Sequence, residues 1–190
     1  MENDKKKIVL ASSSPRRKML LEAVGLDFIV DASSYEEDMT LDLSPEELVK
    51  TLAMGKARDV ASRYTGAIVL GADTMVFIDD HRLGKPHTEE RAREMLRLLS
   101  GKSHVLMTGF ALLDTDTGKI VSEAHPVQIY FKELSQEDID WYIGTGEPLE
   151  RAGAYSMQEQ GGVFIERIEG DRDAGIGLPV KRIIELLKDF

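Results

Sequence analysis

Short apolar runs alternate with capped, amphipathic stretches along nearly the whole chain, and this alternation restricts the fold more than any other feature. The run Ala67–Gly71 is apolar throughout, as a strand covered on both faces must be. The stretch 44–63 begins with "SPEE", a capping box that contains a proline, and then repeats apolar residues at helical spacing. Strands and helices that interleave in this way predict an α/β fold.

The order of the remaining elements predicts the type of sheet. Further strands are expected at Ile8–Ala11, Phe28–Val30, Thr74–Ile78, Val105–Leu113, Ile120–Phe131 and Val163–Ile168. Further helices are expected at 15–24, between Thr88 and Gly101, from Ser135 to the glycines of "GTGEP", and after Leu178–Pro179. The strands on either side of the turn Asp114–Gly118 are close in sequence and therefore antiparallel. We expect a mixed sheet with flanking helices.

The composition excludes several classes of function. A chain of 190 residues suits one domain, 1–190. It has no cysteine, which excludes disulfides and thiolate metal sites. A net charge of −10 argues against binding to long nucleic acid, which needs a basic face. No segment approaches the ~18 consecutive apolar residues of a membrane span, so no membrane partner is expected.

The start of the chain lacks the features of a secretory signal. The apolar run after Lys5–Lys7 is too short, and no small-residue cleavage site follows it. The absence of cysteine fits a reducing compartment. We therefore expect a cytoplasmic protein.

The stretch "IVLASSSPRRKMLLEAVG", residues 8–25, passes from an apolar strand through three serines into a helix. Ser14 is expected at the N-cap and Pro15 at the first helical position. The expected apolar face of this helix consists of Met19, Leu20, Ala23 and Val24. The cations at 16–18 are unfavourable at a helix N-terminus unless an anion compensates them. The turn is therefore either an anion site or a solvated cap.

Two acidic stretches can hold a ligand. "GADT" places Asp73 directly after the apolar strand, at the carboxyl end where open α/β sheets bind ligands. Alternatively, Asp73 is a turn aspartate that bonds its own backbone. Glu36–Asp38 offers oxygen ligands for a hard cation such as Mg²⁺, or forms a solvated loop.

Two lysines and one glutamine complete the set of candidates. "LAMGKA" places Lys56 on a helix beside small residues, and "GKP" places Lys85 in a rigid loop before a helix cap. Each is either a phosphate-binding cation or a solvated one. "AGAYSMQ", residues 152–158, ends on Gln158, whose amide both donates and accepts hydrogen bonds and can bind a base edge. Without further context this segment is an ordinary loop.

Taken together, these stretches resemble the Maf family of nucleoside triphosphate pyrophosphatases along nearly the whole chain. The matching segments, in order, are "LASSSPRRKMLLEAVG", "LAMGKA", "IVLGADTMV", "LGKPHTEERAREML", "LSGKSHVLMTG", "YIGTGEPLERAGAYSMQ" and "GLPV". Seven ordered segments are far more specific than any one of them. The resemblance implies an elongated mixed sheet with flanking helices and two lobes around a cleft, similar to the inosine triphosphatase fold.

The resemblance also implies an activity. Members hydrolyse a nucleoside triphosphate between its α and β phosphates, release pyrophosphate, and use a divalent metal, Mg²⁺ or Mn²⁺. The chain is thus expected to be a homodimeric hydrolase of nucleotide metabolism that clears unwanted nucleotides, and the family is separately tied to an arrest of cell division. "AGAYSMQ" looks like the branch that acts on dTTP and UTP, with modified pyrimidine triphosphates as further candidate substrates. The alternatives are a non-catalytic nucleotide-binding regulator of septum formation and a pyrophosphatase for methylated guanosine triphosphate.

Position by position, the resemblance implies roles for individual residues. The implied catalytic residues are Glu36, Lys56, Asp73 and Lys85, of which Glu36 and Asp73 also hold the metal. The implied substrate-binding residues are Ser12, Ser14, Arg16, Thr74 and Gln158. Base choice is linked to Arg16, Thr74 and Gln158. The chain departs from the family pattern at Glu159, Gln160 and Asp171–Ala174, which flank the expected base pocket.

Elementary chemistry distinguishes these roles. The guanidinium of Arg16 can bind two phosphate oxygens, whereas each lysine is a compact charge. An unperturbed aspartate, with a pKa of about 3.9, is a poor base at neutral pH. We therefore favour Asp73 as the group that orients a metal-activated water, over direct proton abstraction. Arg17 and Lys18 are expected to face solvent.

Overall fold

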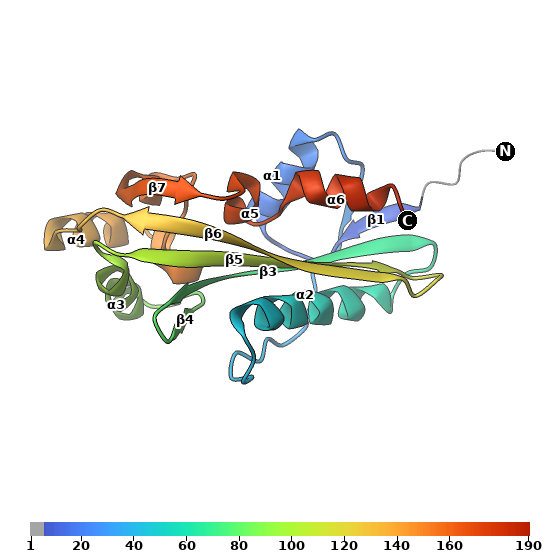
Figure 1. Cartoon of the computed structure of the whole chain (residues 1–190), viewed down its shortest axis with the longest axis horizontal. Helices are drawn as coiled ribbons and strands as arrows, with labels where there is room; N and C mark the ends of the chain where they lie inside the picture. The colour runs from blue at the N-terminus through green and yellow to red at the C-terminus, as the bar shows by residue number, and fades with distance from the viewer. Residues whose placement is uncertain (1–5) are drawn as a thin grey trace. The chain divides into compact units, whose positions relative to one another are not determined.

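The computed structural model describes residues 6–190, which form a seven-stranded mixed sheet with helices packed against it (Figure 1). Residues 1–5, which include Lys5 and the start of the expected 1–190 domain, lie outside the described part. The strands are β1 (Lys7–Leu10), β2 (Ile29–Val30), β3 (Ala67–Ile78), β4 (His81–Leu83), β5 (Ser103–Asp114), β6 (Ile120–Phe131) and β7 (Ile165–Glu169). The α-helices are α1 (Pro15–Ala23), α2 (Pro45–Ala61), α3 (Glu89–Leu99), α4 (Gln136–Gly144), α5 (Arg172–Ile176) and α6 (Val180–Leu187). Three short 3₁₀ helices are η1 (Glu147–Glu150), η2 (Ala152–Ala154) and η3 (Gln160–Phe164).

The strand order is β2-β1-β3-β5-β6-β7, with β4 beside β3. Strand β1 runs parallel to both β2 and β3, whereas the pairs β3–β4 and β6–β7 are antiparallel. The predicted α/β class and mixed sheet are therefore confirmed. None of the helices in the described part of the chain is long and apolar enough to cross a membrane.

The chain divides into two compact units. The first consists of Met1–Asp73, Thr108–His125 and Gly177–Phe190, and the second of Thr74–Met107 and Pro126–Ile176. Each has its own cluster of buried apolar side chains.

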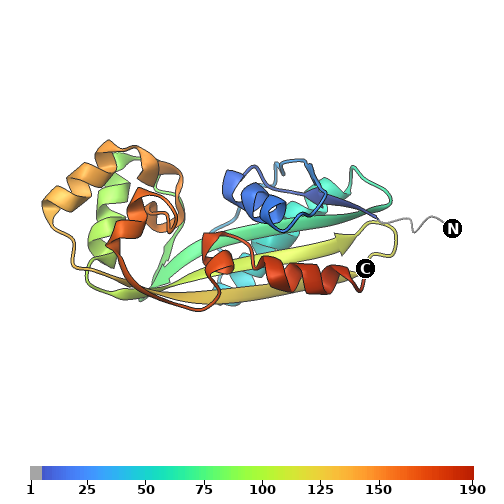
Figure 2. The ribbon, with the colours of Figure 1, turned by 90° about the horizontal axis from the view of Figure 1, so that it is seen from above.

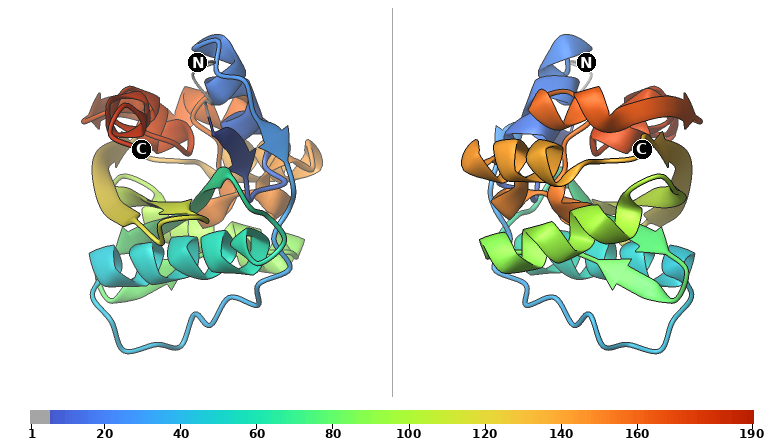
Figure 3. Two further views of the ribbon diagram at one scale, coloured as in Figure 1. Left: turned by 90° about the vertical axis from the view of Figure 1, so that its right-hand side faces the viewer. Right: turned by 90° about the vertical axis from the view of Figure 1, so that its left-hand side faces the viewer.

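In the first unit, α2 covers one face of the strands, and α1 and α6 lie on the other (Figure 3). Its core joins strand residues such as Val69 to Ala53, Ala57 and Val60 of α2. The backbones approach closely because β3 has a glycine at the crossing. A Cβ at Gly71 would overlap the Ala53 carbonyl oxygen and lie 2.7 Å from the Ala57 nitrogen.

In the second unit, α3 and α4 lie side by side (Figure 2) and pack with the strands around an aromatic core. Phe131 contacts Tyr155 and Phe164, and Phe164 meets the Tyr142 ring edge-on at 5.1 Å. The aromatic rings fix the segments 142–143 and 154–164 against the end of the sheet.

The helix ends agree with the capping residues. Ser44 and Ser135 form capping boxes with Glu47 and Asp138, and Thr88 accepts a hydrogen bond from the Arg91 nitrogen. These devices satisfy backbone N–H groups that have no partner within a helix.

Two predictions about local structure are wrong. The runs 67–71 and 74–78 are one continuous strand, β3, because Gly71 serves the close approach of α2 and not a turn. Of the expected apolar face of α1, only Leu20 is buried, whereas Ala23 is exposed and Met19 and Val24 are 43% and 44% exposed. The inner face consists of Arg17, Leu20 and Leu21. The buried stripe therefore lies on a different side of the helix and includes a charged residue.

Candidate active site

The carboxyl end of β1 and the middle of β3 frame the candidate site of the first unit. The parallel ladder between them ends at the pair Leu10 and Leu70, and the Ala11 nitrogen donates to the Leu70 oxygen at 2.8 Å. Beyond this point β3 continues to Asp73, while the chain leaves β1 through Ser12 toward α1. Asp73 therefore lies within β3, past the point at which the parallel partner β1 ends, and not after a strand or in a turn as expected. Open α/β sheets bind ligands at the carboxyl ends of such parallel strands.

Asp73 is part of a chain of charged side chains that runs from Asp73 through Lys56 to Glu37, which is 41% exposed. The Lys56 Nζ donates to Asp73 Oδ1 at 2.6 Å and pairs with Glu37 Oε1 at 2.6 Å. The side chains of Asp73 and Lys56 are only 7% and 13% exposed. Asp73 Oδ2 is buried and has no hydrogen-bond partner among residues 6–190. Such an atom is costly unless a ligand satisfies it.

Arg17 adds a second cation to this cluster. Its Nε donates to the Gly177 oxygen at 3.1 Å, and its Nη1 donates to Ser12 Oγ at 3.0 Å. Burial lowers the pKa of Arg17, while the negative charges of Asp73 and Glu37 oppose that shift. Arginine keeps its proton under these conditions, so the cluster holds two cations and two carboxylates.

The loop between β2 and α2 delivers Glu37. This loop passes from the side of α1 to the side of α2 (Figure 3), where Asp59 of α2 holds it. Asp59 Oδ2 accepts hydrogen bonds from Ser33 Oγ at 2.7 Å and from the Ser34 nitrogen at 2.8 Å. The Tyr35 ring occupies the space that a side chain at Gly55 would fill, one residue before Lys56.

The structure brings together Ser12, Lys56 and Asp73 of the expected site residues in this unit. The guanidinium of the cluster comes from Arg17, and its second carboxylate comes from Glu37, which pairs with Lys56. Glu36 and Glu37 are both exposed, and Arg16 is half-buried. The prediction that Arg17 faces solvent is wrong, because its hydrogen bonds to Ser12 and Gly177 compensate its burial. Residues 17, 20 and 21 share one helix face, and that spacing is the sequence signal for an inward Arg17.

Ser14 occupies the N-cap position of α1, but its side chain makes no capping hydrogen bond. Its backbone nitrogen instead donates to Ser12 Oγ at 3.2 Å. Ser12 Oγ therefore links the start of α1 to the Arg17 guanidinium.

The residues present fit a divalent cation that takes most of its ligands from water and phosphate oxygens. Asp73 Oδ2 lacks a hydrogen-bond partner in the described chain, and Glu37 forms an ion pair with Lys56, the lysine that also binds Asp73. Mg²⁺ is commonly held by one or two carboxylates together with waters and phosphate oxygens. No group of three or more acidic or histidine side chains that could hold a metal occurs between residues 6 and 190.

The second unit carries the remaining expected residues, Thr74, Lys85 and Gln158. Lys85 pairs with Glu150 at 3.0 Å, and both side chains are more than half exposed. The Gly153 nitrogen donates to the Gly84 oxygen at 3.1 Å, so the "GKP" loop and the "AGAYSMQ" segment are hydrogen-bonded to each other. Gln158 is exposed, and Thr74 is half-buried on β3.

Glu159, which departs from the family pattern, has a structural partner. Its Oε2 accepts hydrogen bonds from Arg151 Nε at 3.1 Å and Nη2 at 2.8 Å. This pair joins the segment after Gln158 to the residue between η1 and η2.

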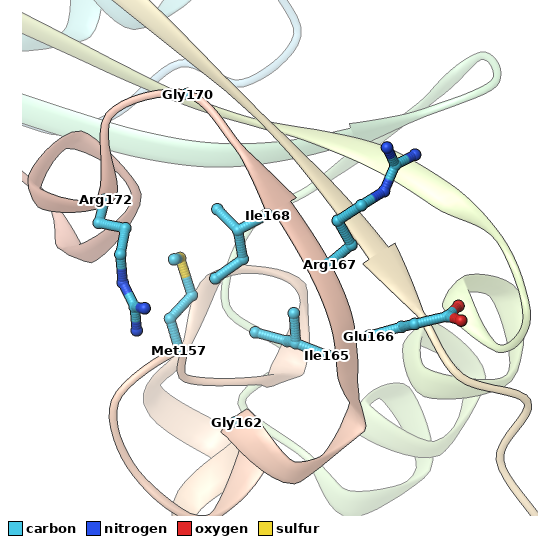
Figure 4. Close-up of a pocket in the computed structure, with 8 residues that line it drawn as sticks. All are labelled: Met157, Gly162, Ile165, Glu166, Arg167, Ile168, Gly170 and Arg172. Carbon is cyan, nitrogen blue, oxygen red and sulfur yellow. The ribbon is translucent and has the colours of Figure 1, made fainter.

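A groove of about 520 Å³ lies beside β7 in this unit. Met157, Ile168 and Arg172 gather on one side of the strand, whereas Glu166 and Arg167 point to the other (Figure 4). None of the expected site residues lines it.

Known proteins resemble the chain over almost its full length. A family model described as "Maf-like protein" matches residues 7–190. A relative from Methanosarcina mazei, named dTTP/UTP pyrophosphatase, is 45% identical over 184 residues and covers 96% of this chain and 93% of its own. A Bacillus cereus relative of the same name is 45% identical over 185 residues, which cover 97% and 90% of the two chains.

A solved structure from Mycobacterium abscessus, titled nucleoside-triphosphatase / dITP/XTP pyrophosphatase, covers 66% of this chain and 74% of its own. It is 17% identical, with a TM-score of 0.43. The family match spans both units and every segment that carries a candidate residue. The chain therefore belongs to the Maf-like protein family.

Proposed function

We propose that the protein hydrolyses dTTP and UTP to the monophosphate and pyrophosphate with the help of a divalent cation. The observation that carries the proposal is the cluster of the buried side chains Arg17 and Asp73 and the largely buried Lys56 with the exposed Glu37, in which Asp73 Oδ2 has no partner within residues 6–190. The names of the 45% identical relatives support the reaction and the substrate class.

The cluster suits phosphoryl transfer, which requires charge stabilisation and in-line positioning of water more than covalent work by the protein. Arg17 is held by Ser12 and Gly177, so its guanidinium is preorganised to bind phosphate oxygens. Lys56 adds a compact positive charge next to Asp73. Both cations stabilise negative charge as the bond between the α phosphorus and the bridging oxygen breaks.

Asp73 orients the attacking water in this proposal. Its Oδ1 is taken by Lys56, which leaves the buried Oδ2 to accept a hydrogen bond from water. Glu37 and Asp73 are the residues that would hold the divalent cation. That cation supplies neutralising charge and acidifies water when it is bound.

Base choice is proposed to lie in the second unit. The exposed amide of Gln158 can donate to a pyrimidine carbonyl and accept from its N–H, which matches the edges of thymine and uracil. A site built to pair with such an edge rejects bases that leave its polar groups unpaired. Lys85 is the proposed phosphate-binding cation of this unit.

A substrate panel tests the proposal. The purified protein is incubated with dTTP, UTP, dCTP, ATP, dGTP and methylated guanosine triphosphate in Mg²⁺ or Mn²⁺, and pyrophosphate and phosphate are detected separately. We expect pyrophosphate from dTTP and UTP above all others, and no turnover after chelation of the metal. Equal rates on all substrates would reject the proposed base choice, and release of orthophosphate would reject the reaction.

A further inference from the structure

One buried tyrosine and one carboxylate of the second unit hold the segment that presents Gln158. We call this segment, residues 156–161, the Gln158 arch. The Tyr142 hydroxyl donates to Glu147 Oε1 at 2.7 Å and accepts from the Ser156 nitrogen at 3.2 Å. Tyr142 and Glu147 therefore fix the beginning of the arch.

The same carboxylate fixes the end of the arch. Glu147 Oε2 accepts from the Gln160 nitrogen at 3.0 Å, and Oε1 accepts from the Gly161 nitrogen at 3.1 Å. Gln158 lies between the two anchor points with its side chain exposed. Three groups, the Tyr142 hydroxyl and the Gln160 and Gly161 nitrogens, thus converge on the Glu147 carboxylate, for which the sequence motifs predict no role.

The anchor is tightly built. Tyr142 is fully buried, and a Cβ at Gly161 would overlap its hydroxyl and lie 3.0 Å from the Ser156 nitrogen. Burial and the hydrogen bond to Glu147 raise the pKa of Tyr142, so the hydroxyl stays protonated and donates. Gly146, with φ of +74°, sets the backbone immediately before Glu147.

We infer that Glu147 and Tyr142 are positioning residues for pyrimidine selection, which act by holding the arch so that the Gln158 amide is preorganised. The inference rests on the proposed role of Gln158 in base choice. A preorganised amide binds its partner without the cost of ordering a mobile segment. Loss of either anchor group should weaken the binding of the preferred base and leave the hydrolytic step in place.

Steady-state kinetics of single and double variants test the inference. Glu147→Gln replaces one acceptor oxygen with an amide donor, and Tyr142→Phe removes only the hydroxyl from a ring that fills the core. We expect each to lower the ratio of kcat/KM for dTTP to kcat/KM for dGTP by about tenfold, through a higher KM for dTTP, with kcat changed less than about threefold. Gln158→Ala should lower the ratio by a similar factor.

The double variants separate positioning from a general structural role. If the anchor acts through Gln158, Glu147→Gln and Tyr142→Phe will not lower the ratio further in the Gln158→Ala background. Glu137→Gln, which changes an exposed carboxylate of α4, is the matched control and should leave the ratio unchanged. Thermal unfolding of each variant shows that the compared proteins are folded.

Each outcome decides between the two proposals. If Gln158→Ala lowers the ratio but neither anchor variant does, the inference is overturned and the proposed base choice stands. It is also overturned if the anchor variants lower the ratio equally with and without Gln158. If Gln158→Ala has no effect, the proposed base choice fails and the inference fails with it.

Discussion

The two units hold their candidate site residues in opposite ways. In the first, Arg17, Lys56 and Asp73 are withdrawn from solvent, Lys56 pairs with Asp73, and Arg17 bonds to Ser12 and Gly177. In the second, Lys85 and Gln158 are exposed, and only the scaffold beneath Gln158 is buried. Charge interactions are strong when desolvated and weak at the surface. Substitutions in the first unit should therefore alter both turnover and stability, and those in the second should alter affinity and preference alone.

The largest effect is expected for Asp73→Asn. Loss of the carboxylate removes the group proposed to orient water and leaves the positive charges of Lys56 and Arg17 less compensated. Turnover at saturating Mg²⁺ should fall about a thousandfold, and the free energy of unfolding should fall by about 3 kcal/mol. Kinetics and urea denaturation measure the two effects. Asp80→Asn, the same change in an exposed turn, should affect neither. Near-full activity of Asp73→Asn would contradict the assignment.

A smaller effect is expected for the adjacent carboxylates Glu36 and Glu37. Because Glu37 pairs with Lys56, Glu37→Gln should lower kcat/KM about thirtyfold and Glu36→Gln less than threefold. Titration of each variant with Mg²⁺ should show a raised half-saturating concentration only for Glu37→Gln. The reverse order of effects would show that the loop rearranges around substrate.

Lys85→Met tests the exposed candidate residues of the second unit. We expect the KM for dTTP to rise about tenfold, because one phosphate-binding charge is lost. The free energy of unfolding should change by less than about 0.5 kcal/mol, since the Lys85–Glu150 pair is exposed. Glu150→Gln removes the partner and keeps the cation, so its KM should stay within about twofold. A large loss of stability in Lys85→Met would break the contrast between the units.

A further prediction concerns the pH dependence of stability and His104 in the core of the second unit. Its Nε2 lies 2.7 Å from the Tyr155 hydroxyl, and burial lowers the pKa of His104 to about 4. In the unfolded chain His104 takes up this proton near pH 6.5. The free energy of unfolding is therefore not reduced by His104 well above that pH, and it falls as the pH drops toward 4. At pH 5 the loss should be about 2 kcal/mol.

Urea denaturation between pH 7.5 and pH 5 measures this loss. The window lies above the range in which the carboxylates of lowered pKa, such as Glu123 and Asp59, take up protons. His104→Gln has no titrating ring and should have a flatter profile. An equally steep profile in that variant would assign the pH dependence to other groups.

Sequence patterns predicted those parts of the fold that local interactions determine. Ser44, Thr88 and Ser135 cap helices as expected, and Gly101 adopts the positive φ that follows a helix end. The expectation that a strand ends at Gly71 is wrong, because a glycine serves a turn and a close approach equally well. Only the position of α2, which is a long-range feature, decides between them.

In the candidate site, too, local sequence patterns do not decide which individual residue takes part. The motifs contain two pairs of identical neighbours, Arg16–Arg17 and Glu36–Glu37, and the residue types alone cannot distinguish the members of a pair. The helical stripe selects Arg17, and the hydrogen bonds of Asp59 to the loop determine how far that loop extends over α2. Lys56 and Asp73 have no identical neighbour, and both lie in the cluster as expected.

The close crossing at Gly71 links the geometry of the proposed site to the packing of the core. Ala53 and Ala57 touch β3 at this glycine, and Lys56 and Asp73 project from the same helix turn and the same strand. Any side chain at position 71 would push α2 outward and lengthen the Lys56–Asp73 contact. The distance between the backbones of α2 and β3 thus determines the distance between the charged groups of Lys56 and Asp73. A well-packed core and the geometry of the proposed site therefore both require that Gly71 has no side chain.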